Sequence, residues 1–105
     1  MPDLFKLLQQ AQQVQARMAE VQASLSRQAV VGQAGGGLVT VTADGHGAVR
    51  AVSIAPAAVT PDDVASLEDL VTVAIGEAQR RAKALSQAEM AKVTGGLDLP
   101  FPLPF

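Results

Sequence analysis

The stretch GGGLVTVTADGHGAVRAVSI, residues 35–54, decides the fold of this chain. Its apolar residues alternate with polar ones, first at Val39 and Val41 and again at Val52 and Ile54. A period of two is typical of a half-buried β-strand. The glycine-rich segments on either side of the first strand allow tight turns, because glycine accepts positive φ without steric cost. The stretch therefore predicts two adjacent antiparallel strands.

The residues before this stretch predict a further strand and a long helix. A strand over 28–32 would complete a three-stranded antiparallel meander, which Pro56 closes. From Leu4 onward, apolar residues recur in steps of three and four, the spacing of a helix packed against another helix. These residues are Leu4, Leu7 or Leu8, Ala11, Val14, Met18, Val21 and Leu25. The helix should have about 24 residues and a length of roughly 36 Å.

The residues after the sheet predict a second long helix. Thr60 is the expected N-cap and Pro61 the first helical residue, followed by two aspartates that favour the positive end of the helix dipole. The helical period then continues, with Ser66 or Gly76 as the expected place of any break, until the TGG segment at 94–96 ends it. Its apolar seam consists of Leu67, Val71, Ala74, Ala78, Ala82 and Leu85. Uninterrupted, this helix would span about 48 Å.

These elements predict a single α+β domain over 1–105, with the order α-β-β-β-α and an extended tail rich in Pro and Phe over 94–105. A compact domain of 100 residues has a radius of gyration of only about 13 Å, so the second helix must project beyond its own sheet. The projecting apolar seam needs a partner, and a second copy of the chain is the simplest one. We therefore expect a homodimer.

Composition limits the classes of function. The chain has 105 residues, of which 49% are hydrophobic and only 3% aromatic, and it has no cysteine. The N-terminus lacks a signal-peptide pattern, and no run of about 18 apolar residues could span a membrane. We therefore expect a soluble, cytoplasmic protein without disulfides. Eight basic and ten acidic residues give a net charge of −2, so nucleic-acid binding would require local basic patches.

Residues suited to catalysis or cofactor binding are few. His46, the only histidine, lies between two glycines and should be an exposed turn residue. The aspartates at 62–63 fit a helix start, and the acidic residues at 68–69 fit a solvated face, better than an acid–base pair or a metal site. The glycines at 35–37 precede a strand, unlike a phosphate-binding loop. We expect no catalytic activity, cofactor, metal or small-molecule substrate.

Patches of basic and amide side chains lie on the two predicted helices. The segment 78–92 carries four basic residues and one acidic residue, and residues 7–22 include six glutamines. Arg81 is also placed to pair with Glu77, four residues earlier. Ordinary solubilising charge is the alternative interpretation of both patches. The candidate binding residues are Lys6, Gln10, Gln13, Arg17 and Arg27 on the first helix and Arg80, Arg81 and Lys83 on the second.

Four segments in register resemble the YbaB/EbfC family of bacterial nucleoid-associated proteins. They are KLLQQAQQVQARMAEVQ (6–22), GQAGGGLVTVTADGHGAVRAVSI (32–54), LEDLVTVAIGEAQRRAK (67–83) and TGGLDLP (94–100). Together they extend over nearly the whole chain. The resemblance implies a tweezer-like homodimer whose projecting helices bind double-stranded DNA in the nucleoid and alter its conformation, with effects on gene expression or DNA repair. It implies neither a cofactor nor catalysis.

Under this resemblance, the basic candidates would contact phosphates, and the glutamine amides would donate to phosphates or base edges. Because the chain has few aromatics for base stacking and no Cys/His set for a zinc finger, we expect little sequence specificity. The alternative is a helical adaptor that binds another protein through the glutamine-rich helix and the LPFPLPF tail at 99–105. We expect that tail to pack back on the dimer, since exposed apolar strips are uncommon.

Overall fold

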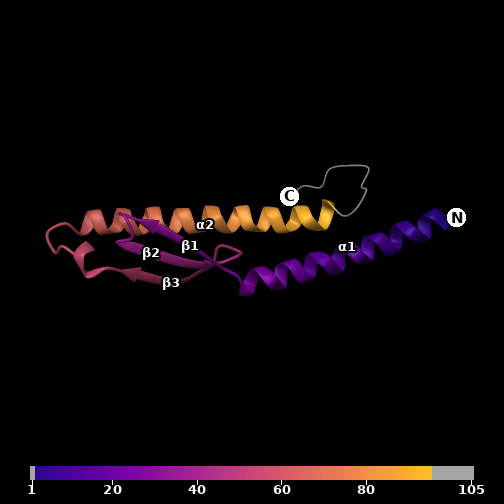
Figure 1. Ribbon diagram of the computed structural model, residues 1–105, viewed down its shortest axis with the longest axis horizontal. Helices are drawn as coiled ribbons and strands as arrows, with labels where there is room; N and C mark the ends of the chain where they lie inside the picture. Colours follow the sequence, from indigo (N-terminus) through magenta and orange to yellow (C-terminus); the bar gives the residue numbers. More distant parts are fainter. Residues whose placement is uncertain (1, 96–105) are drawn as a thin grey trace.

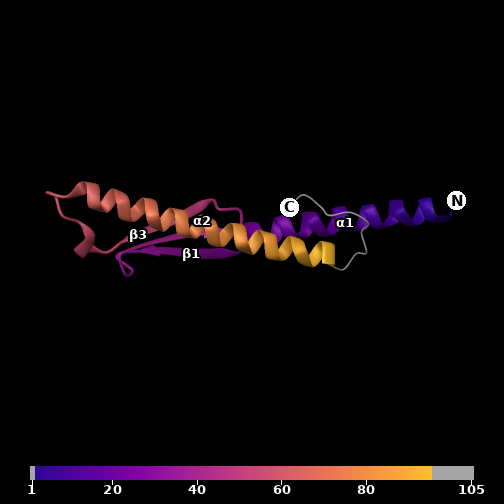
Figure 2. The same cartoon turned by 90° about the horizontal axis from the view of Figure 1, so that it is seen from above.

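The computed structural model describes residues 2–95 as an elongated molecule (Figures 1 and 2). Its elements are the helix α1 (Pro2–Arg27), the strands β1 (Ala29–Ala34), β2 (Val39–Asp44) and β3 (Val49–Ile54), the short 3-10 helix η1 (Pro56–Ala58) and the helix α2 (Val64–Gly95). The predicted α+β fold with the order α-β-β-β-α is confirmed. The molecule measures 73 × 22 × 16 Å and has a radius of gyration of 19.7 Å, so its helices project as predicted. The predicted tail beyond residue 95 lies outside the described residues.

The three strands form one antiparallel sheet in the order β1-β2-β3, which confirms the predicted meander. The first strand is longer than the predicted 28–32, because it begins at Ala29 and continues to Ala34. The three glycines at 35–37 all have positive φ, so the chain reverses only after Ala34. Ala34 can therefore still pair with Val39 across the turn.

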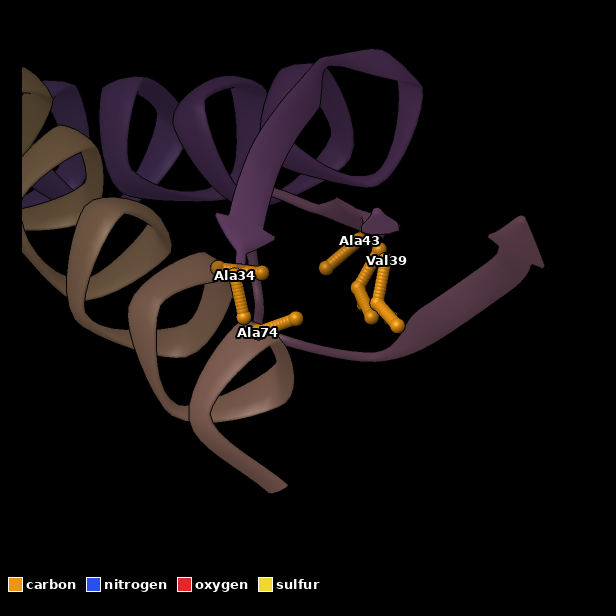
Figure 3. Close-up of a cluster of buried hydrophobic side chains, with 6 residues drawn as sticks. Ala34, Val39, Ala43 and Ala74 are labelled. Carbon is orange, nitrogen blue, oxygen red and sulfur yellow. The ribbon is translucent and has the colours of Figure 1, made fainter. Parts of the chain in front are cut away.

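The core lies between α2 and the strands β1 and β2 (Figure 3). It is made of small side chains: Ala34, Val39, Val41, Ala43, Ala74 and Ala78. Gly32 of β1 lies directly under α2, where a Cβ atom would overlap the carbonyl oxygen of Ala74 and lie 2.9 Å from the Cα atom of Ala78. Small side chains bury little apolar area each, so the stability of the core depends on this close approach of helix and strand.

β3 remains uncovered, although the alternation of its residues predicted a half-buried strand. The register pairs Val41 with Val52 and Val39 with Ile54, which places Val52 and Ile54 on the same face of the sheet as the core. However, α2 packs mainly over β1 and β2, and Val52 and Ile54 are 45% and 40% exposed. The prediction of a buried face on β3 is therefore wrong for the single chain.

The start of α2 differs from the prediction. The helix begins at Val64, and Thr60 does not cap it. Instead, the carboxylate of Asp63 accepts hydrogen bonds from the backbone N–H of Ser66 (3.3 Å) and from its hydroxyl (2.6 Å). The aspartate is the better cap because its ionised carboxylate also favours the positive end of the helix dipole. The helix then runs without a break through Ser66 and Gly76 to Gly95, inside the predicted TGG segment.

Part of the predicted apolar seam of α2 is covered within its own chain, and the predicted homodimer stays a prediction. Ala74, Ala78 and Ala82 are buried, whereas Leu67, Val71 and Leu85 are half-buried. The projecting half of α2 contacts α1, and the buried Val93 lines the groove between the two helices. Figures 1 and 2 both show α1 and this half of α2 leaving the sheet at the same end. The seam of α1 is buried only near the sheet, at Leu25. Its outer apolar residues are 56–70% exposed: Leu4, Phe5, Leu7 and Leu8.

Candidate nucleic-acid interface

The turn between β2 and β3 holds α1 against the sheet. The backbone N–H of Gly45 donates to the carbonyl of Leu25 at 2.8 Å. His46 Nε2 lies 2.8 Å from the carbonyl oxygen of Gln22 and 3.1 Å from Oγ of Ser26. Because a carbonyl oxygen can only accept, Nε2 carries a hydrogen. His46 is exposed, as predicted, but its ring also fixes the position of α1, a role that the sequence did not indicate.

Asp44 is a buried carboxylate at the end of β2, and its role was not predicted from the sequence. It accepts hydrogen bonds from the backbone N–H groups of His46 (2.9 Å) and Ala48 (3.1 Å) and from the guanidinium of Arg50 (2.7 Å). Burial raises the pKa of Asp44, but the hydrogen bonds from Ala48, Arg50 and His46 together outweigh it, so the pKa lies below its ordinary value. The only available signal was an Asp-Gly turn with an arginine six residues after the aspartate.

A polar cleft of about 480 Å³ opens between this turn and one flank of α2. We call it the hairpin cleft, and its polar lining includes Gln22 of α1, His46 of the turn, and Gln79, Lys83, Ser86 and Gln87 of α2. The Gln79 side-chain amide donates to the carbonyl of Gly47 at 3.2 Å, which joins the turn to the helix. Among the predicted binding residues, only Lys83 lines this cleft.

Arg81 lies away from the cleft, above the open edge of β1. Its guanidinium pairs with Glu77 at 2.8 Å, as predicted, and also donates to the carbonyl of Val31 at 2.9 Å. The hydrogen bond to Val31 satisfies a carbonyl acceptor on the edge strand β1, so Arg81 links α2 to the sheet. By contrast, Arg80 and Lys83 form no ion pair with any residue in the range 2–95.

A second groove, of about 250 Å³, lies between α1 and α2. Its charged lining consists of Arg17, Glu20, Glu89 and Lys92, and Lys92 pairs with Glu89 at 3.3 Å. Over the part of the chain that the structure describes, the two basic and two acidic side chains give this groove no net charge. Arg17 is exposed, as a phosphate contact must be, but it shares its surroundings with two carboxylates, which weakens its attraction for an anion.

The other predicted residues lie along the outer surface of α1. Lys6, Gln10, Gln13 and Arg27 are all exposed. They extend over about 31 Å of helix, at 1.5 Å per residue. The structure thus distributes them along an arm and does not gather them into one pocket, an arrangement suited to an extended ligand.

Charge is segregated along the molecule. Four acidic residues occupy the beginning of α2 and the loop before it, at the end opposite the N-terminus of α1 (Figure 1). They are Asp62, Asp63, Glu68 and Asp69. Outside 62–69, the described residues carry eight basic and five acidic side chains. The net charge of −2 therefore conceals a positive balance over the arms and the adjoining part of the sheet.

Other kinds of site find little support in the part of the chain that the structure describes. Within residues 2–95, no group of three His, Cys, Asp or Glu side chains could hold a metal ion. Neither helix, over the same residues, has the length and apolar character needed to cross a membrane. What the surface does offer is a series of exposed cations and amides on two projecting helices, and such donors suit contact with a polyanion.

The fold and this surface thus define the class of protein as an elongated α+β scaffold with two projecting helices that expose cations and amides. The sequence profile of the YbaB/EbfC DNA-binding family matches residues 1–97. A nucleoid-associated protein of Gemmatimonas aurantiaca is 46% identical over 103 residues, which cover 98% of this chain and 99% of that protein. Another, from Desulfotalea psychrophila, is 44% identical over 98 residues, with coverage of 93% and 92%. A third, from Chloroflexus aurantiacus, is 47% identical over 92 residues, with coverage of 88% and 92%. The chain belongs to the YbaB/EbfC DNA-binding family, which confirms the resemblance seen in its sequence.

Proposed function

We propose that this chain binds double-stranded DNA as a homodimer in the bacterial nucleoid, with little sequence specificity, and alters the conformation of the DNA. Such a change would affect gene expression or DNA repair without catalysis. The observation that carries the proposal is the segregation of charge, because it leaves a positive balance on the two projecting helices of an acidic protein. Membership of a DNA-binding family supports the nature of the partner, and the names of the relatives support the location in the cytoplasmic nucleoid.

The homodimer rests on apolar surface that the described residues of one chain leave open. Val52 and Ile54 continue the core face of the sheet beyond the edge of α2, and the outer residues of α1 continue its apolar seam. Covering such surface gains about 25 cal/mol per Å² of apolar area. A second copy that covers both regions would also double the number of arms, and two arms related by a two-fold axis can contact a duplex on both sides of its centre.

DNA contact is expected along the arms, and it should depend mainly on phosphates. Lys6 and Arg27 on α1 and Arg80 on α2 are exposed cations without an ion pair in the range 2–95. The amides of Gln10 and Gln13 can donate to phosphates or base edges without adding charge. Since phosphates carry no sequence information directly, we expect unrelated duplexes to differ by less than about tenfold in affinity, or about 1.4 kcal/mol.

The test titrates the full chain with short duplexes at several salt concentrations and measures binding by fluorescence anisotropy. If each dimer neutralises about four to six phosphates, the logarithm of the affinity falls against the logarithm of the salt concentration with a slope near −4 to −5. Lys6→Ala combined with Arg80→Ala should flatten the slope by about 0.9 for each phosphate that the variant no longer neutralises.

Glu68→Gln provides a matched control on α2. Glu68 lies about 18 Å along the helix from Arg80, at 1.5 Å per residue, and this exceeds the Debye length of about 8 Å at physiological salt. The control variant should therefore keep the slope of the parent chain. If an intact dimer shows no DNA binding at low salt, the proposal is wrong, and the helical adaptor becomes the better interpretation.

A further inference from the structure

The hairpin cleft has the lining expected of an anion site. Among residues 2–95, none of those that line it is acidic, and they include Lys83, the ring of His46 and three glutamines. The nearest carboxylate of the turn, Asp44, is buried and holds the Arg50 guanidinium at 2.7 Å, so its charge is already compensated. The groove between α1 and α2 contrasts with this cleft, because Glu20 and Glu89 line it.

Donors in the hairpin cleft remain free for a ligand. Among residues 2–95, no ion pair or hydrogen bond involves the side chains of Lys83, Ser86 and Gln87. These three groups lie on consecutive turns of one flank of α2. An ammonium group, a hydroxyl and an amide together provide more donors than acceptors. Such a set suits a ligand whose oxygens only accept, as those of a phosphate do.

The wall of the hairpin cleft formed by α1 and the turn is held in place by the fold. His46 is fixed by the contact of Nε2 with the Gln22 carbonyl and by the hydrogen bond from its backbone N–H to Asp44. Gln79 ties the neighbouring Gly47 to α2. The cleft therefore joins α1, the turn and α2 at the point where both arms leave the sheet, and a ligand bound there needs little rearrangement of its walls.

From this arrangement we propose that the hairpin cleft binds a backbone phosphate of the DNA that the arms contact, with Lys83 as the charged ligand and Ser86 and Gln87 as neutral donors. This inference rests on the proposed function and adds to it a defined subsite at the base of the arms. A volume of about 480 Å³ accommodates a phosphodiester with its sugars and still leaves room for water.

The test compares Lys83→Gln with Lys92→Gln in the same salt titration. Lys92 is the matched control, because it lies on the same helix but is paired with Glu89 at 3.3 Å and outside the cleft. If Lys83→Gln leaves one phosphate per chain without its cation, the slope should flatten by about 0.9 for each occupied cleft, and the affinity should fall about eightfold per cleft at 0.1 M salt. Lys92→Gln should change the slope by less than half as much, and Lys83→Arg should retain the binding of the parent chain.

A second measurement locates the ligand independently of affinity. In NMR titrations, duplex DNA should shift the side-chain signals of Lys83 and Gln87 and the backbone amide of Gly47, and inorganic phosphate should compete for these shifts. If phosphate shifts these signals but DNA does not, the cleft is a small-anion site and the inference is wrong. If the parent chain binds DNA but Lys83→Gln leaves the slope unchanged, the inference alone is overturned. If the parent chain binds no DNA, the proposed function fails as well.

Discussion

Replacement of Gly32 by alanine should destabilise the protein strongly, although it adds a single methyl group. The added Cβ atom would overlap the carbonyl oxygen of Ala74 and the backbone nitrogen of Ala78, and would lie 2.9 Å from the Cα atom of Ala78. All of these atoms belong to the backbone of a helix that makes its own hydrogen bonds, so none can rotate aside. The helix itself must move away from β1.

The size of the effect follows from that movement. Restoring an ordinary contact requires an outward shift of about 1 Å, and a gap of 0.5–1 Å already removes roughly a quarter to a half of the dispersion energy between the separated atoms. The core of alanines and valines under α2 has no larger side chain to fill the gap. Overpacking usually costs about 1–3 kcal/mol, and the higher backbone freedom of glycine in the unfolded chain offsets this by up to about 1 kcal/mol. We expect a net decrease in the free energy of unfolding of about 2 kcal/mol.

This decrease is measured by chemical denaturation, with unfolding monitored by far-UV circular dichroism. Both variants and the parent chain are compared at equal chain concentrations, because dimerisation would make stability depend on concentration. A decrease of about 2 kcal/mol corresponds to a decrease in Tm of roughly 8–16 °C for a domain of this size. Gly76→Ala is the matched control, since Gly76 lies inside α2 and the nearest atom to its added Cβ is Nη1 of the flexible Arg80 side chain, at 3.4 Å. That variant should be more stable by about 0.5–1 kcal/mol. Equal stability of Gly32→Ala and the parent chain would refute the close approach of helix and strand.

Three further outcomes are expected. The folded-state pKa of Asp44 is lowered, so its contribution to stability is complete above the unfolded pKa of about 3.9 and is lost as the pH falls through the folded value. The stability difference between the parent chain and Asp44→Asn should thus be largest above about pH 5 and shrink below pH 4 in denaturation experiments; a constant difference would exclude this linkage. Val52→Lys, on the uncovered core face of β3, should shift the mass in sedimentation equilibrium from dimer to monomer, whereas Ser53→Lys, on the opposite face, should not; dimers in both variants would exclude this face as the interface. Arg81→Gln should lower stability by about 1 kcal/mol, because it leaves the Val31 carbonyl without this donor and Glu77 without its cation, and it should change the salt dependence of DNA binding less than Arg80→Gln does.

Local structure could be predicted from the sequence because it depends on short-range rules. The period of two around Val39 and Val41 and the glycines beside that strand specified the meander, and the three-and-four spacing specified both helices. The Arg81–Glu77 pair followed in the same way from the geometry of one helical turn. Local rules did not place the start of α2, because both Thr60 and Asp63 are residue types that cap helices. The structure uses Asp63, whose carboxylate accepts hydrogen bonds from Ser66.

Tertiary structure alone decided which apolar faces are covered and which polar groups meet. Alternation shows that β3 has an apolar face, but not that α2 lies over β1 and β2 and leaves Val52 exposed. Likewise, the spacing of α2 puts Lys83 and Gln87 on one flank, but only the packing of the turn against that flank creates the hairpin cleft. The physical reason is that periodicity reports the backbone geometry of a single element, whereas the lateral placement of elements depends on contacts between residues distant in sequence, such as Gly32 with Ala74 and His46 with Gln22.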